Sequence, residues 1–201
     1  MDFKARAVCR SRCGWGGVAA GLLALGCLLC LCCLGAQGTK APKRYAYKVL
    51  KAYPHDAQAY TQGLCIHQGT LYEGLGLHGQ SAIRTVDLKT GAVIKNRELP
   101  RRYFGEGICV LNGLLYQLTW REQTCFVYRC ETLEQLAAMP YAGEGWGLTT
   151  NGAQLIMSNG SHVISYLSPR DMSVCKRLEV HTDKGNVDML NELELVGGEL
   201  W

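Results

Sequence analysis

The feature that most constrains the fold is a repeat in the chain beyond residue 45. Four ten-residue segments align without gaps, and each has a lead residue, an apolar run, a turn containing glycine and a second apolar run. The segments are 62–71, 106–115, 146–155 and 191–200, so the lead residues recur at intervals of 44, 40 and 45 residues. This period is typical of four-stranded β-propeller blades.

Turn residues support a second hairpin in each of the first three units. Asn112-Gly113 and Asn151-Gly152 suit the first hairpins, because both residue types adopt positive φ. The second hairpins are expected to turn at 89–91, near 131–132 and at 168–170. Two hairpins make four strands per unit, so the sequence predicts an all-β fold. A β-sandwich with regularly spaced turns is the alternative.

The N-terminal segment, residues 1–44, has a different character from the rest. Basic residues precede a charge-free apolar run of 19 residues, 18–36, which we interpret as an apolar helix. It is either a signal peptide cleaved near Ala36 or a retained signal anchor. Both interpretations put the domain at 45–201 in the secretory pathway, lumenal or extracellular, with membrane contact only through this segment. The sequon Asn159-Gly160-Ser161 is compatible with glycosylation.

Charge and cysteine content narrow the function classes. The formal net charge is +4, but residues 1–44 carry +6 and the remainder −2, so no nucleic-acid surface is expected. Six of the 11 cysteines lie in the N-terminal segment. With five left, at least one is unpaired in an oxidising compartment. Cys125 and Cys130 should face opposite sides of their sheet. The five histidines show no metal-ligand spacing, so no metal site is predicted.

The repeat also predicts a site. Equivalent positions of successive blades surround one axis, so Gln62, Glu106, Trp146 and Asn191 should meet at one mouth of the central channel. A purely structural position would hold similar residues in every unit, whereas this one holds two amides, an acid and an indole. Such diversity at a shared position is typical of a binding site. Trp120, expected on the strand after that of Glu106, lies near enough to join them.

At these residues the chain resembles the plant and bacterial glutaminyl cyclases. The matching stretches run in order from residue 45 to residue 201, and Arg84 also fits; they are 55–64, 103–108, 115–120, 145–148 and 190–194. The resemblance implies a five-bladed β-propeller. Here it would be incomplete, with about three and a half to four blades, because the last residue lies inside the strand pair that begins with Asn191.

The resemblance implies a glutaminyl-peptide cyclotransferase, which cyclises N-terminal glutamine to pyroglutamate and releases ammonia. It implies a general acid/base at Glu106 and a substrate-binding set formed by Gln62, Trp120, Trp146, Asn191, Phe104 and Tyr60. The expected partners are peptides or proteins with an N-terminal glutamine. No cofactor is expected to be required, structural calcium is a further candidate, and the protein is expected to be a monomer.

Other interpretations stay open at this point. Gln62 and Asn191 could simply satisfy strand-end backbone groups, and Glu73 reads as structural. Two stretches depart from the family pattern, 73–76 and 158–160. The alternative function is a non-catalytic lumenal propeller that binds peptides or proteins, which needs the fold and the aromatic residues but no acid/base group.

Overall fold

The computed structural model describes residues 4–6 and 45–201, and within these ranges it contains strands and no helix. The apolar helix expected in the N-terminal segment lies outside the described residues. In the part of the chain that is described, no helix is long and apolar enough to cross a membrane.

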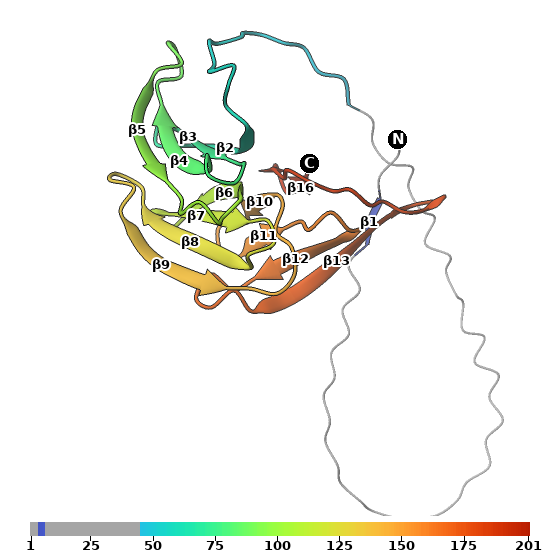
Figure 1. The fold of residues 1–201 in the computed structure, drawn as a ribbon. Helices are drawn as coiled ribbons and strands as arrows, with labels where there is room; N and C mark the ends of the chain where they lie inside the picture. The colour runs from blue at the N-terminus through green and yellow to red at the C-terminus, as the bar shows by residue number, and fades with distance from the viewer. Residues whose placement is uncertain (1–3, 7–44) are drawn as a thin grey trace, which may run out of the picture.

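Three consecutive antiparallel sheets of hairpin-connected strands form most of the fold (Figure 1). The first contains β2 (Thr61–His67), β3 (Thr70–Leu75), β4 (Ala82–Val86) and β5 (Val93–Glu98). The second contains β6 (Gly105–Leu111), β7 (Leu114–Thr119), β8 (Thr124–Arg129) and β9 (Gln135–Pro140). The third contains β10 (Leu148–Thr150), β11 (Leu155–Met157), β12 (Val163–Leu167) and β13 (Val174–Thr182).

Short strands complete the architecture. β1 (Lys4–Arg6) and β14 (Gly185–Asn186) both pair with β13, and β15 (Leu195–Val196) pairs with β16 (Glu199–Leu200) as a separate two-stranded sheet. The part of the chain that the structure describes is therefore all-β, as the repeat predicted, and it contains four antiparallel sheets. The second hairpins turn where the sequence indicated, between β4 and β5, β8 and β9, and β12 and β13.

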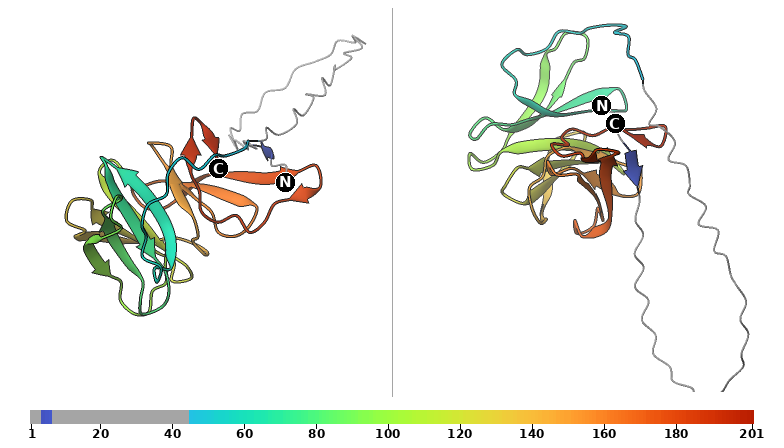
Figure 2. Two further views of the ribbon diagram at one scale, coloured as in Figure 1. Left: turned by 90° about the horizontal axis from the view of Figure 1, so that it is seen from above. Right: turned by 90° about the vertical axis from the view of Figure 1, so that its right-hand side faces the viewer.

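The sheets follow one another with their first strands innermost (Figures 1 and 2). Strand β6 packs against both β2 and β10. The last strands, β5 and β9, are exposed along almost their whole length, whereas β6 is almost entirely buried. The first three of the four repeat segments thus begin on or beside neighbouring strands near one axis, although they are some 40 residues apart in sequence.

Glycines make this close approach of the first strands feasible. Gly63, Gly107 and Gly147 each follow a lead residue. A Cβ atom at Gly63 would lie 2.6 Å from the Ile108 nitrogen, and one at Gly107 would lie 2.5 Å from the Trp146 carbonyl oxygen. At Gly147 it would meet the Asn191 carbonyl oxygen. Because the obstacle is main chain in every case, a side chain there would force the sheets apart.

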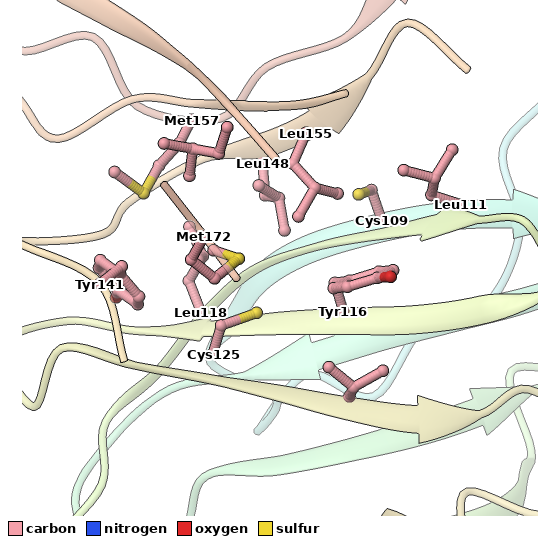
Figure 3. Close-up of a cluster of buried hydrophobic side chains, with 12 residues drawn as sticks. Cys109, Leu111, Tyr116, Leu118, Cys125, Tyr141, Leu148, Leu155, Met157 and Met172 are labelled. Atoms are coloured by element: carbon pink, nitrogen blue, oxygen red, sulfur yellow. The ribbon is translucent and has the colours of Figure 1, made fainter. Parts of the chain in front are cut away.

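Two apolar clusters fill the space between successive sheets. One joins the first and second sheets through residues such as Ile83 and Leu115, both fully buried. The other joins the second and third sheets, where Leu118 and Leu155 are fully buried among Tyr, Met and Cys side chains (Figure 3). A third cluster lies on the face of β11–β13 opposite the second sheet, where these strands pack against residues from 187 to 200. Because successive side chains of a strand point to opposite faces of the sheet, one strand contributes apolar side chains to the clusters on both faces.

The turns of the first hairpins in the second and third sheets differ in their use of positive φ. Asn112 and Gly113 both have positive φ, 52° and 75°, as predicted. In the other turn only Gly152 does, at 86°, because Asn151 instead accepts hydrogen bonds from the backbone at Ala153 and Gln154 through its side chain. The hairpin predicted at Asn151-Gly152 is confirmed, but Asn151 does not adopt the positive φ that was expected of it.

The cysteine prediction is confirmed for the described residues. Cys125 belongs to the cluster between the second and third sheets, and Cys130 to the cluster on the other side of the second sheet. They therefore lie on opposite faces. All five cysteines within 45–201 are free thiols.

The glycine contacts give a test of the fold. Gly107→Ala should lower the free energy of unfolding by about 3 kcal/mol, because the new methyl group meets the main chain of the next sheet. Gly113→Ala is the matched control: its surroundings are open, so only the positive φ penalises alanine, by about 1 kcal/mol. Urea denaturation of both variants measures the difference. Equal losses would contradict the packing role of Gly107.

Candidate active site

Glu106 is a buried carboxylic acid at the start of β6. The residue is only 5% exposed, and glycines flank it on both sides, Gly105 and Gly107. Gln62 on β2 donates a hydrogen bond from Nε2 to Glu106 Oε2 at 2.6 Å. The first two lead residues are therefore in direct contact, as the repeat predicted.

The environment of Glu106 favours its neutral form. Burial raises the pKa of Glu106 to about 8, and the negative charges of Glu122 and Glu144 act in the same direction, while the hydrogen bond from Gln62 opposes them. The carboxyl therefore carries its proton at neutral pH and can release it slightly above. A group with a pKa near the working pH is well suited to donate and accept protons.

Two indoles share one acceptor near the start of β6. Trp146 immediately precedes Gly147 and β10, and its carbonyl oxygen accepts a hydrogen bond from the Gly107 nitrogen at 2.8 Å. Trp120 was expected on the strand after that of Glu106, but it is the first residue after that strand, β7. Both indole N–H groups donate to Glu144 Oε2, at 2.8 Å from Trp120 and 3.0 Å from Trp146.

Further aromatic rings extend from Trp120 to the other side of the site. Phe104 contacts Trp120 with ring centroids 5.6 Å apart, and Tyr60 and His78 each contact Phe104 edge-on, at 6.1 and 5.5 Å. The Trp120 nitrogen donates to the Phe104 carbonyl oxygen, which ties the turn after β7 to the approach to β6. Such edge-to-face contacts are favourable and hold ring orientations.

Asn191 joins the group only through its main chain. Its carbonyl oxygen accepts a hydrogen bond from Ser158 Oγ at 2.6 Å and lies against Gly147, whereas the residue as a whole is exposed. The fourth lead position is thus adjacent to the third, as the repeat predicted. Its substrate-binding role stays a prediction.

Sequence reasoning missed Glu144, Glu122 and His78. Glu144 stands two residues before Trp146 and supplies the acceptor for two indoles. A partly buried indole N–H usually finds an acceptor, so a carboxylate this close to a suspected site tryptophan was a usable signal. Nothing in the sequence indicated that Trp120, 24 residues earlier, shares that acceptor.

Glu73 and Arg84 form a separate, buried ion pair on the first sheet. Arg84 Nε donates to Glu73 Oε2 at 2.7 Å, and the other Glu73 oxygen is bonded by Thr61 Oγ1 at 2.5 Å and His55 Nε2 at 2.8 Å. Arg84 also reaches Asp56 at 3.0 Å. The network ties the segment before β2 to β3 and β4, and so anchors the strand that carries Gln62. This arrangement agrees with a structural Glu73.

No group of three or more His, Cys, Asp or Glu side chains within residues 45–201 is arranged to hold a metal ion.

Fold and site together define a described region that is all-β, with consecutive antiparallel sheets built on four hairpin-connected strands each, and with a buried carboxyl and paired indoles where the innermost strands begin. A family model described as glutamine cyclotransferase matches residues 22–201. The chain belongs to this glutamine cyclotransferase family.

Individual relatives agree with the family assignment. Over 157 residues the chain is 37% identical to a glutaminyl-peptide cyclotransferase of Arabidopsis thaliana, a match that covers 77% of this chain and 49% of the relative. The crystal structure of Myxococcus xanthus glutaminyl cyclase matches with a TM-score of 0.71 and 29% identity, over 76% of this chain and 65% of that one. The chain therefore spans about half the length of the plant relative.

A more distant likeness concerns the fold alone. The RRP9 WD40 repeats match with a TM-score of 0.50 and 12% identity, over 69% of this chain and 43% of theirs.

The raised pKa of Glu106 predicts a pH dependence of stability. The pKa is about 8 in the folded chain and near 4.5 in the unfolded one, so between these values only the folded state keeps the proton. Rising pH therefore favours unfolding, at about 1.4 kcal/mol per pH unit for one full proton. Glu106→Gln should remove one proton's share of this slope, as measured by urea denaturation from pH 5 to pH 8.

The control for this experiment is Glu134→Gln. Glu134 is exposed and pairs with Arg129, away from the site, so its loss should leave the slope as in the wild type. An unchanged slope in Glu106→Gln would show that Glu106 is already ionised in the folded chain.

Proposed function

We propose that this protein is a glutaminyl-peptide cyclotransferase, which converts an N-terminal glutamine of a peptide or protein to pyroglutamate. The observation that carries the proposal is the buried Glu106 carboxyl, with its pKa raised to about 8 and its hydrogen bond from Gln62. Family membership and the 37% identity to the plant enzyme support the same conclusion.

The reaction needs one group that can move a proton. The free α-amine of the substrate attacks the carbon of its own γ-carboxamide, forming the ring C–N bond. The bond to the amide nitrogen then breaks, and this nitrogen leaves as ammonia only after it gains a proton. Glu106, which starts with its proton, would donate it to the leaving nitrogen and take up the proton that the attacking amine loses, so that the carboxyl is restored at the end of each turnover.

The aromatic residues would supply proximity. Trp120, Trp146 and Phe104 are proposed to enclose the glutamine side chain in the folded-over conformation that brings amine and carboxamide together, with Tyr60 beside them. Gln62 has a second N–H besides the one bonded to Glu106, and this could donate to the oxygen of the tetrahedral intermediate. Asn191 is the other proposed donor, and its exposed position makes it the group that would have to reorient.

The complete fold is proposed to be a five-bladed β-propeller of which this chain contains three full blades and the first hairpin of a fourth, β15–β16. The lead residues of the repeat support this proposal, as does the partial coverage of both relatives. Structural calcium in the channel and a monomeric state are further parts of the proposal.

The N-terminal segment is proposed to direct the protein to the secretory pathway, either as a cleaved signal peptide or as a signal anchor. The basic residues before the apolar run 18–36 support this interpretation. In that pathway Asn159 would then meet the machinery that glycosylates asparagine. Within the structure Asn159 Oδ1 accepts a hydrogen bond from Ser161 Oγ at 2.6 Å.

Release of ammonia from a glutamine-initiated fluorogenic peptide tests the function. The chain itself, and a version extended by the C-terminal part of the Arabidopsis relative, should form product at neutral pH. Glu106→Gln should lower kcat by at least 100-fold, because acid–base catalysis contributes about that much or more. Circular dichroism would confirm that the variant keeps its fold.

The contrary outcome is equally definite. If neither version forms product while both still bind the peptide, the protein is a binding protein and not an enzyme. The same activity in Glu106→Gln as in the wild type would remove Glu106 from the mechanism.

A further inference from the structure

We propose that Glu144 is a positioning residue, which holds the indoles of Trp120 and Trp146 as two fixed walls beside Glu106. The inference rests on the proposed function, because it takes Glu106 as the acid/base and the indoles as the substrate enclosure. Glu144 itself is not proposed to touch the reacting atoms.

The geometry supports a shared anchor. One oxygen, Glu144 Oε2, accepts both indole N–H groups, at 2.8 Å from Trp120 and 3.0 Å from Trp146. An indole has a single donor, so this bond fixes the direction in which each ring lies. The other oxygen accepts a hydrogen bond from Arg121 Nε at 3.1 Å. The guanidinium of Arg121 in turn lies 3.8 Å from the centre of a Trp120 ring.

The anchor connects two different sheets. Trp120 directly follows β7 of the second sheet, and Trp146 lies just before β10 of the third. The Gly145 nitrogen also donates to the Trp120 carbonyl oxygen, so main chain and side chains cross the same boundary. Glu144 therefore fixes the two indoles relative to each other at the place where the strand of Glu106 meets the third sheet.

An ordinary surface ion pair would not explain this arrangement. Arg121 is 64% exposed and Glu144 is 38% exposed, so their pairing alone contributes little to stability. Charge-assisted hydrogen bonds from two partly buried indoles have a specific geometry, and the indoles lose this acceptor if the carboxylate is removed.

Charge adds a second effect of Glu144 on the acid. Hydrogen bonds from Trp146, Trp120 and Arg121 lower the pKa of Glu144, so it stays ionised while Glu106 is neutral. The negative charge of Glu144, with that of Glu122, helps to raise the pKa of Glu106. Tyr141 and Glu192 are the other titratable groups that interact with Glu106. Loss of the Glu144 charge should therefore lower the pH at which Glu106 ionises.

Two variants separate the roles. Glu144→Gln keeps an oxygen acceptor for the indoles and removes the charge, whereas Glu144→Ala removes both. The probes are the indole N–H signals of ¹⁵N-labelled protein, assigned with Trp120→Phe and Trp146→Phe. The side-chain amide signal of Gln62, which donates to Glu106, reports the titration of that acid.

In Glu144→Ala both indole signals should move upfield and their protons should exchange faster with water. In Glu144→Gln the indole protons should stay protected, while the midpoint of the Gln62 titration falls. Glu134→Gln, which removes an exposed acid paired with Arg129, should change neither probe. Glu122→Gln should lower the Gln62 midpoint without moving the indoles.

The inference is overturned if both indole signals stay unchanged in Glu144→Ala, or if the Gln62 midpoint is the same in Glu144→Gln as in the wild type. If Glu144→Ala does not fold, the Glu144→Gln measurements decide alone. None of these probes depends on turnover. If the shifts are as expected but the protein shows no cyclase activity, the proposed function is refuted and the positioning role is kept. If the protein shows cyclase activity but the shifts are absent, the positioning role is refuted and the proposed function is kept.

Discussion

The close approach of the innermost strands is the constraint on which the rest of the structure depends. Main chain meets main chain where β2, β6 and β10 begin, and only glycine leaves room for it at residues 63, 107 and 147. Each of these glycines directly follows a lead residue of the repeat. The same contact that joins the sheets therefore brings Gln62, Glu106 and Trp146 together, so packing and site formation are one event.

Electrostatics then gives nearby acids different states. Among the described residues Glu106 accepts a hydrogen bond from Gln62 only, and it is buried, which keeps it neutral up to a pH of about 8. Glu144 has three donors and is partly exposed, so it is ionised well below that pH. A neutral acid that can move a proton beside a charged acid that orients its surroundings is a division of roles familiar from enzymes. Here the division follows from burial, from the number of donors and from neighbouring charges.

Much of this could be read from the sequence, because the features involved are local or periodic. The spacing of Gln62, Glu106 and Trp146 predicted that they would meet, and the hairpin turns fell between the predicted strands. Asn151 does not adopt the expected positive φ, because its side chain accepts the backbone hydrogen bonds of the turn instead. Glu144 was missed because its two indole donors come from residues 2 and 24 positions away, and the second of these is a neighbour only after the sheets pack.

By itself, the sequence determined the four-stranded units, the family and the identity of the residues that share one end of the axis, because a repeat imposes equivalent positions whatever the details of packing. The tertiary structure decided which carboxyl keeps its proton, which one holds the indoles, and that Asn191 takes part through its main chain. These properties depend on burial and on partners from other sheets. Side-chain chemistry along the chain therefore cannot specify them until the strands have met.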